Sequence, residues 1–403
     1  MDVFVPRIMA EEFKERNYTM IKQLDLSEQY KKLNVEILDR VKQVFETQQF
    51  VMGNFVGEFE KACADYFEAK HAISVASGSD ALLIALLSIG IQKGDKVITT
   101  PFTFFATASA ITRLGGTPLF VDIEPETFNI SVPAIEQALK KNRGVKAILP
   151  VHLYGRSADM EGIMKLAKKY RVRVIEDAAQ AFGARSRYKN EYRKAGTIGD
   201  IGCFSFYPTK NLGGAGDGGM MVTNNDKLAA LLKMLRAHGS PERYIHKYHG
   251  INSRLDALQA VVLSVKLNHI EQWNHTRMEL ARRYNDLFSG AGLTGSITCP
   301  DVPDDLTHIV HQYTVRIKNR DSIRQALKED GIGTEVYYPI PLHLQPVFKY
   351  LGYKKGSLKQ TELAAKEVLS LPLYPEMTVE QQVQVVDSFK KIQESRFKTK
   401  DSK

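Results

Sequence analysis

The run Ala72-Ile73-Ser74-Val75-Ala76 opens the part of the chain that decides the fold. Its apolar and β-branched residues predict a strand, and Leu82, Leu83, Leu86 and Leu87 recur after it at helical spacing. Further strands are expected at 96–100, 119–122, 147–151, 172–177 and 218–223, with helical segments such as 106–114 between them. Strands that alternate with helices of about 10–15 residues indicate a largely parallel sheet covered on both faces. The sequence therefore predicts an α/β fold.

The pattern changes in the last third of the chain. A long helix is expected over 254–287, followed by a strand at 312–317, a helix at 322–329, a strand at 334–338 and two closing helices. The 403 residues are more than one compact core usually holds. We therefore expect a second, smaller domain from residue 275 onward.

Composition excludes several classes of protein. The chain is 43% apolar and 25% charged, and its longest apolar runs are too short to cross a membrane. Charged residues among the first twenty exclude a secretory signal. Three widely spaced cysteines favour a reducing compartment over a disulfide framework, and none has a partner at metal-ligand spacing. We expect a cytoplasmic protein without a metal site.

The net charge of +9 has two interpretations. A basic protein attracts polyanions, and a nucleotide diphosphate is a small one. Basic residues also crowd the segment 390–403, where a solvated tail is the simpler explanation. That tail lacks the interleaved aromatic residues of a surface that binds single-stranded nucleic acid, so no nucleic-acid partner is expected.

Two residues suggest chemistry on pyridoxal phosphate. Lys210 lies in a loop between two apolar segments, where burial can make its amine nucleophilic enough to form a Schiff base. Asp177 ends the apolar run 172–177, and an acid there can keep a pyridine nitrogen protonated. Taken singly, such a lysine is usually a solvated surface group, and such an aspartate is usually a turn or cap residue.

The segment Gly214-Ala215-Gly216-Asp217-Gly218-Gly219 matches the glycine pattern of dinucleotide-binding proteins. That motif needs a strand before it and a helix after it. Here a polar loop precedes the glycines and a strand is expected to follow. We interpret them as a turn behind Lys210 that lets the backbone approach a cofactor closely.

Five sequence blocks together resemble the nucleotide-sugar aminotransferases, the perosamine-synthetase-like branch of the fold-type I pyridoxal-phosphate enzymes. The resemblance covers about residues 22–390, with residues 1–22 before it as an extension. The blocks are Ala76-Ser77-Gly78-Ser79-Asp80-Ala81-Leu82, Pro101-Phe102-Thr103-Phe104, Glu176-Asp177-Ala178-Ala179-Gln180, 205–214 and Gly250-Ile251-Asn252-Ser253-Arg254. The resemblance implies a large domain over 23–274, with a mostly parallel seven-stranded sheet flanked by helices. It also implies a smaller C-terminal α+β domain over 275–403.

The resemblance also assigns the contacts of the cofactor phosphate. Gly78, Ser79 and Asp80 lie between a strand and a helix, where free backbone N–H groups favour an anion. From spacing alone, a plain N-cap made by Ser79 is the more common arrangement. By resemblance the Gly78–Asp80 turn contacts the phosphate, and Ser205 adds a second contact. The alternative for Ser205 is a buried strand serine bonded to backbone.

The remaining site residues are likewise implied by the resemblance. Phe104 would stack on the pyridine ring, and Gln180 would lie near the phenolic oxygen of the cofactor unless it is a surface amide. Asn252 would reach the phosphate bound by the partner chain, which implies a homodimer with shared active sites. His343 and Tyr338 would lie near the substrate, although a lone histidine is more often structural.

The resemblance implies transamination of a nucleotide-linked keto sugar to an amino sugar, with L-glutamate as amino donor. The sequences of residues 78–82 and 337–345 resemble more closely the relatives that aminate C3 of the sugar than those that aminate C4. The amino sugar would serve polysaccharide or natural-product biosynthesis. Whether the nucleotide is dTDP or UDP stays open. Two alternatives remain. A related branch of sugar dehydratases carries histidine where this chain has Lys210, which disfavours that activity. The other alternative is a regulatory protein that kept the fold without catalysis.

Overall fold

The computed structural model describes residues 20–400, with side chains to residue 394. Within that range, seven strands form one sheet in the order β1-β9-β8-β5-β4-β2-β3. The strands are β1 His71–Val75, β2 Lys96–Thr99, β3 Thr117–Phe120, β4 Val145–Leu149, β5 Arg173–Asp177, β8 Ile201–Ser205 and β9 Gly219–Thr223. Only β9 runs against the others of this sheet, because it pairs antiparallel with both β1 and β8. The predicted, mostly parallel sheet is confirmed.

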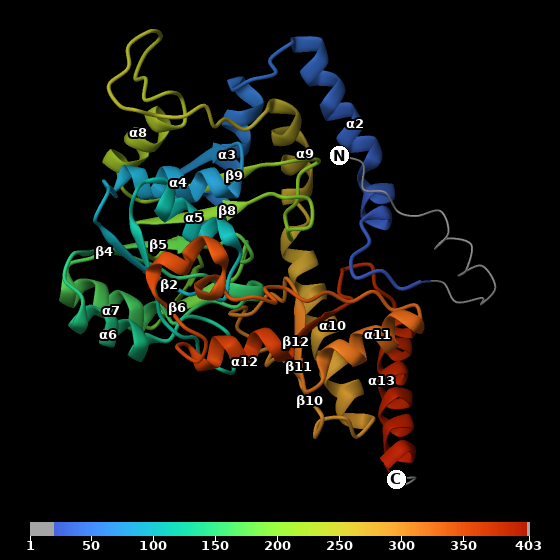
Figure 1. Cartoon of the computed structure of the whole chain (residues 1–403). Coiled ribbons are helices and arrows are strands. Elements are labelled where there is room, and N and C mark those ends of the chain that lie inside the picture. Colours follow the sequence, from blue (N-terminus) through green and yellow to red (C-terminus); the bar gives the residue numbers. More distant parts are fainter. Residues whose placement is uncertain (1–19, 401–403) are drawn as a thin grey trace.

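Helices cover both faces of this sheet (Figure 1). One face carries α4 Gly78–Ser88, α5 Phe105–Arg113 and α8 Asp226–Leu235, and the other carries α3 Gly53–Phe67, α6 Val132–Lys141, α7 Met160–Tyr170 and α9 Ala257–Leu267. Neighbouring strand residues point to opposite faces, so Val97 packs on the first set and Ile98 on the second. Because both faces are buried, the middle of each strand is mostly apolar, as the sequence pattern indicates.

A second, antiparallel sheet stands beside the first, at the lower centre of Figure 1. It consists of β10 Ile297–Thr298, β11 Tyr313–Ile317 and β12 Val368–Leu371. Helices α10 Ile270–Gly290, α11 Arg320–Glu329 and α13 Val379–Lys400 enclose a separate apolar core with it. Ile21 is 2% exposed in this core and pairs with Ile332. Thus the end of the expected extension belongs to the fold, while residues 1–19 lie outside the described residues.

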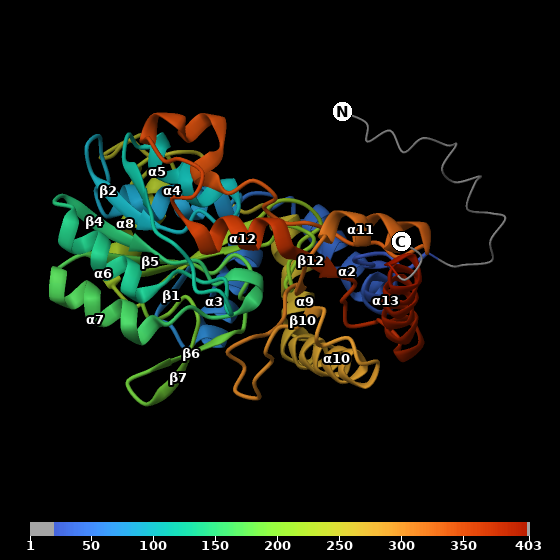
Figure 2. The ribbon, with the colours of Figure 1, turned by 60° about the horizontal axis from the view of Figure 1, so that its bottom comes forward.

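The segment between α11 and β12 returns to the larger body. The 3-10 helices η3 Leu342–Leu344 and η4 Pro346–Leu351 place Leu342 and Phe348 against Phe120 of β3. Helix α12 Lys359–Glu367 then lies where the two bodies meet (Figure 2). The expected boundary at 274/275 falls inside the continuous helix α10. The division into two domains at that point stays a prediction.

The structure differs from two expectations about elements and adds strands that were not expected. The single helix over 254–287 is two helices, α9 and α10, separated at Asn268 and His269. No strand forms over 334–338; Glu335 makes one isolated bridge to Ser370, and Tyr338 has a φ of 62°. The strand β12 and the exposed hairpin of β6 Arg185–Tyr188 and β7 Glu191–Lys194 were not anticipated.

Candidate active site

The predicted site residues gather where parallel strands end. Asp177 is the last residue of β5, Ser205 is the last residue of β8, and Gly78 follows β1 as the first residue of α4. These three strands run in the same direction, so their carboxyl ends lie at one edge of the sheet. Ligands of open α/β sheets bind at this edge.

Lys210 is carried by a closed loop between β8 and β9. Its backbone N–H donates to Tyr207 O at 2.8 Å across a turn with Pro208 in second position. A Cβ on Gly213 would lie 2.3 Å from Pro208 O, so only glycine fits there. Burial lowers the pKa of Lys210 to about 8, against the opposing effect of the Asp177 charge. With this pKa roughly a tenth of the amine is unprotonated at pH 7, far more than for an ordinary lysine.

The carboxyl group of Asp177 is held on both oxygens. Thr107 of α5 donates to Oδ2 at 2.8 Å, and Ala179 N–H donates to Oδ1 at 3.2 Å. Burial raises the pKa of Asp177, although these hydrogen bonds and the Lys210 charge act to lower it. A buried carboxylate of this kind is stabilised by a cation brought next to it, such as a protonated ring nitrogen. The sequence analysis missed Thr107, which lies three residues after Phe104.

The N-terminus of α4 fits an anion. Ser77 is its N-cap and accepts from Asp80 N–H at 3.1 Å, so the alternative of Ser79 as N-cap is wrong. Within residues 20–394, the hydroxyl of Ser79 has no hydrogen-bond partner. A Cβ on Gly78 would lie 2.6 Å from Cβ of Ser205, which brings the two turns into direct contact. Free N–H groups and two nearby hydroxyls form a cradle suited to a phosphate.

Asp80 has a different neighbour from the one expected. The hydroxyl of Ser253 donates to Oδ2 of Asp80 at 2.8 Å. Oγ of Ser253 in turn accepts from Ala76 N–H at 3.0 Å. Asp80 therefore ties the 250–254 segment to the start of α4. Its contact with the cofactor stays a prediction.

Gln180 is 8% exposed, which excludes the surface-amide alternative. Its Oε1 accepts from Tyr154 N–H at 2.7 Å, and its Nε2 donates to Oη of Tyr338 at 2.8 Å. Burial raises the pKa of Tyr338, so its phenol stays protonated. The structure thus joins two predicted site residues from different blocks of sequence.

Phe104, Asn252 and Arg254 lie at the periphery of this site. Phe104 is the N-cap residue of α5 and is 63% exposed. Asn252 is exposed, and its backbone pairs with Ala237. Arg254 is partly buried, and among residues 20–394 it forms no ion pair with Asp256. An exposed Asn252 is compatible with a contact to a second chain, which stays a prediction.

His343 has a partner inside the protein. Its side chain is fully buried, and Nε2 lies 3.2 Å from Oε1 of Glu362. Glu362 also accepts from the N–H groups of Gly356 and Leu358, so it organises the start of α12. This arrangement favours the structural alternative for His343, and its contact with substrate stays a prediction.

A buried acid beside Asp177 was not anticipated. Glu176 accepts from the N–H groups of Gly196, Ile198 and Gly199, and its Oε2 lies 2.9 Å from Nε2 of His152. Burial acts to raise the pKa of Glu176, but the His152 contact and the N–H groups outweigh it and lower the pKa. The position of Glu176 in the block with Asp177 was the available signal. Its pairing required the tertiary structure.

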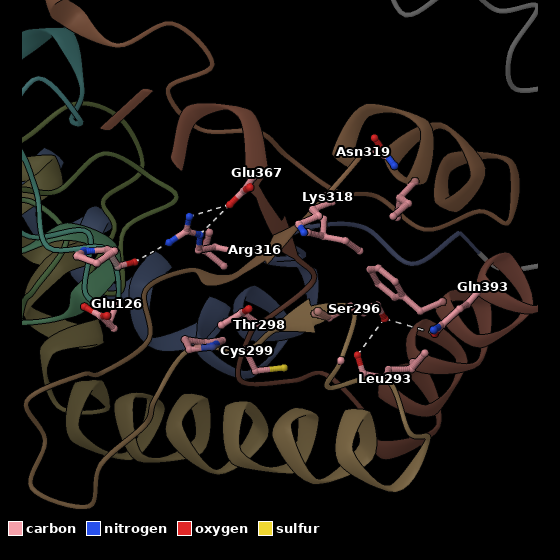
Figure 3. Close-up of a pocket in the computed structure, with 18 of the residues that line it drawn as sticks. Glu126, Leu293, Ser296, Thr298, Cys299, Arg316, Lys318, Asn319, Glu367 and Gln393 are labelled. Atoms are coloured by element: carbon pink, nitrogen blue, oxygen red, sulfur yellow. Dashed lines mark hydrogen bonds and ion pairs between the residues drawn. The ribbon is translucent and has the colours of Figure 1, made fainter. Parts of the chain in front are cut away.

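A cavity of about 1120 Å³ lies elsewhere, between the two bodies (Figure 3). Arg316 of β11 crosses it, donating to Pro125 O at 3.0 Å and pairing with Glu367 at 2.7 Å. Lys210 and Asp177 are not among its lining residues. Among residues 20–394, no cluster of side chains has the make-up of a metal site, and no described helix combines the length and apolarity needed to span a bilayer.

Comparison with known proteins identifies the family. Two curated relatives are the pleiotropic regulatory protein of Geobacillus stearothermophilus, 49% identical over 90% of this chain and 96% of its own, and the UDP-N-acetyl-3-dehydro-alpha-D-glucosamine 3-aminotransferase of Acidithiobacillus ferrooxidans, 41% identical over 90% and 95%. The crystal structure of S. venezuelae DesV in complex with a ketimine intermediate superposes with a TM-score of 0.88, at 38% identity over 93% of this chain and 98% of that one. Residues 31–390 match the model of one family, and the chain belongs to it: the DegT/DnrJ/EryC1/StrS aminotransferase family.

Proposed function

We propose that this protein is a pyridoxal-phosphate-dependent aminotransferase that converts a nucleotide-linked keto sugar to an amino sugar. The observation that carries the proposal is the buried Lys210, with a pKa lowered to about 8, electrostatically coupled to a buried Asp177 at the strand ends. The cradle at the start of α4 supplies the anion site that a phosphate-bearing cofactor requires. Membership of an aminotransferase family supports the same reaction class.

Each residue has a defined task in this proposal. When bound, the cofactor supplies an aldehyde that condenses with amines and a ring that accepts electrons. As the neutral amine, Lys210 would bond to that aldehyde with loss of water, and once released it would carry a proton as general base and then general acid. Asp177 would hold the ring nitrogen protonated, while the α4 N–H groups, Ser79 and Ser205 would bind the phosphate. Gln180 and Tyr338, joined by a hydrogen bond of 2.8 Å, would help to orient the ring.

The finer points of the proposal extend from the relatives. One relative is named for amination at C3 of a UDP-linked sugar, which supports C3 as the position aminated here. We propose L-glutamate as amino donor, a cytoplasmic location, and a homodimer in which Asn252 reaches the partner's site. Exposure of Phe104 and Asn252 in the single chain supports the shared site, because both residues would be covered on association.

A regulatory role is the second candidate, favoured by the name of the 49% identical relative. Position 210 distinguishes it from catalysis. The wild-type protein should develop an absorbance band near the visible edge on addition of pyridoxal phosphate, and the Lys210→Ala protein should lose both this band and transamination. Lys194→Ala is the matched control, because burial also lowers the pKa of Lys194, but this residue lies on the hairpin strand β7. A wild-type protein without the band would favour the regulator.

The sugar is identified by a panel of substrates. The enzyme loaded with the amine form of the cofactor is mixed with nucleotide-linked 3-keto and 4-keto sugars, carried by dTDP or by UDP. Return of the aldehyde absorbance reports transfer of the amine. Return with 4-keto sugars alone would refute amination at C3.

A further inference from the structure

Thr107 of α5 is a buried threonine whose hydroxyl touches the proposed acid of the site. Thr107 is 1% exposed, and its Oγ1 donates to Oδ2 of Asp177 at 2.8 Å. A second hydroxyl lies behind it, because Oγ1 of Thr103 is 3.0 Å from Oγ1 of Thr107. Thr103 is 3% exposed and directly precedes Phe104, the N-cap residue of α5. We call Thr103 and Thr107 the hydroxyl pair.

The hydroxyl of Thr107 is directed away from its own helix. Serine and threonine side chains inside helices often donate to a carbonyl oxygen one turn earlier. Two other residues of α5 do so: Ser109 donates to Ala106 O at 3.3 Å, and Thr112 donates to Ser109 O at 3.2 Å. Thr107 donates instead to the end of β5, 70 residues away in the sequence. Its hydroxyl therefore serves Asp177 rather than α5.

Counting hydrogens fixes the direction of both bonds. A hydroxyl group has one hydrogen to donate, and an ionised carboxylate can only accept. While Asp177 is ionised, Thr107 must use its hydrogen on Oδ2, so the hydrogen between the two threonines must come from Thr103. Donation by Thr103 polarises the Thr107 hydroxyl and strengthens its bond to the acid. Ala179 N–H donates to Oδ1 at 3.2 Å, so each oxygen of the acid has a donor.

Asp177 needs these donors because it is buried. Burial raises the pKa of Asp177, and the Thr107 hydrogen bond, the Ala179 N–H and the charge of Lys210 oppose that rise. The lysine helps only as the ammonium ion, and its pKa is about 8. The state in which Lys210 can attack an aldehyde is therefore the state in which Asp177 loses this nearby positive charge. The hydroxyl pair stays in place whatever the protonation of the lysine.

The other titratable groups that act on Asp177 add no positive charge. Nδ1 of His152 accepts a backbone N–H at 3.0 Å, so the ring hydrogen lies on Nε2, toward Glu176, and the ring is neutral. Burial raises the pKa of the Cys203 thiol and that of the Tyr338 phenol, and both groups stay protonated. The hydroxyl pair therefore matters most once the lysine is neutral.

We infer that the hydroxyl pair positions the carboxylate of Asp177 and keeps it ionised beside the ring nitrogen of the cofactor. Thr107 is a positioning residue in this scheme, and Thr103 acts through it. The inference rests on the proposed role of Asp177 toward pyridoxal phosphate. A carboxylate with its donors in place is a weak base and leaves the proton on the ring nitrogen, whereas one that has lost a donor draws that proton toward itself.

The protein without cofactor provides the first test. ¹³C NMR of protein labelled at the aspartate carboxyl groups follows the titration of Asp177, whose signal is assigned by its loss in Asp177→Asn. Thr107→Val removes the hydroxyl and keeps the shape, so the midpoint should lie about one pH unit above that of wild type. Thr107→Ser keeps the hydroxyl and should restore the wild-type midpoint. Identical titration curves for wild type and Thr107→Val would overturn the inference, whether or not the protein binds a cofactor.

The second test follows the ring nitrogen itself. Pyridoxal phosphate labelled with ¹⁵N in the ring reports by its chemical shift whether that nitrogen is protonated. We expect the protonated signal in wild type and a signal displaced toward the unprotonated value in Thr107→Val. Thr103→Val should give a smaller displacement in the same direction. Thr99→Val is the matched control, because it removes a buried hydroxyl that donates to Leu149 O rather than to Asp177.

Kinetics and stability distinguish positioning from a purely structural role. A less protonated ring accepts electrons less well, so kcat of Thr107→Val should fall about tenfold with KM for the amino donor unchanged. Melting temperatures show which variants are folded, and Thr103→Val carries the same measurements if Thr107→Val does not fold. Folded variants that melt earlier, as Thr99→Val should, but keep the wild-type ring signal would show a structural pair and overturn the inference. A wild-type protein that does not bind pyridoxal phosphate would instead refute the proposed function.

Discussion

The pKa values of Lys210 and Asp177 are both shifted by burial, and the charge of each residue acts on the other. Burial lowers the pKa of the lysine and raises that of the acid, so neither is at its usual value before any ligand arrives. The negative charge of Asp177 opposes the effect of burial on Lys210. Buried groups with shifted pKa values at the carboxyl ends of strands are typical of catalytic sites.

The first prediction concerns pH. Only the neutral amine of Lys210 attacks an aldehyde, so capture of pyridoxal phosphate by the apoprotein should accelerate with rising pH and level off above about 8. Asp177→Asn removes a charge that favours the ammonium form, so the midpoint should move to lower pH. Stopped-flow absorbance measures both profiles. Asp226→Asn, which removes an exposed carboxyl group, should leave the midpoint in place, and a wild-type midpoint near 10 would contradict the prediction.

The sequence allowed prediction of the residues expected to act on the cofactor, but not of the residues that position them by hydrogen bonds. Lys210, Asp177 and Gln180 lie in short recognisable blocks. Thr107 contacts Asp177 across a separation of 70 residues, which no local pattern encodes. The N-cap was assigned to Ser79 rather than Ser77 because both are serines at the same strand–helix junction.

At the scale of elements, local patterns predicted the buried strands well. Short apolar and β-branched runs between helices predicted β1 to β5 and β9 to within about two residues of their bounds, but not β8. The break between α9 and α10 was missed because Asn268 and His269 carry no glycine or proline signal. The segment 334–338 is rich in strand-forming residues, but Tyr338 adopts a left-handed conformation and no strand forms. Tertiary context overrode propensity there.

The junction of β1 and α4 yields the second prediction. Gly78→Ala would place a Cβ 2.6 Å from Cβ and 3.1 Å from Cα of Ser205, so the turns must separate and the phosphate cradle must widen. We expect affinity for pyridoxal phosphate to fall by about an order of magnitude, measured by absorbance titration. Gly57→Ala is the control, because a Cβ in α3 meets nothing within 4 Å. That variant should keep its affinity and gain about 1 kcal/mol of helix stability.

At the scale of the whole molecule, the exposed residues at the site matter most. Ser253 fixes the segment carrying Asn252 by donating to Asp80 and by its N–H bond to Arg236 O at 2.9 Å. Asn252 itself stays exposed at the end of this rigid support. A second chain placed against this surface would receive the amide at a defined position.

Complementation tests the shared site. Lys210→Ala and Asn252→Ala chains should each have little activity, whereas hybrid dimers contain one site with both native residues. Random mixing should restore about a quarter of wild-type activity, because half the dimers are hybrids with one intact site of two. Mixing Lys210→Ala with the double variant Lys210→Ala, Asn252→Ala provides the control without rescue. Absence of rescue in the first mixture would contradict a site built from two chains.

The return of residues 342–358 to β3 has a consequence for dissecting the protein. The polypeptide passes from the larger body to the smaller one through α10, goes back through η3 and η4, and ends in the smaller body with α13. Cutting the chain at one point therefore cannot give two fragments that fold independently, because each fragment would lack part of its hydrophobic core. Arg316 of the smaller body also donates hydrogen bonds to Pro125 O and to the carboxylate of Glu367, where the two bodies meet. Loosening of either half is therefore transmitted to its neighbour, and the two should melt in a single cooperative transition.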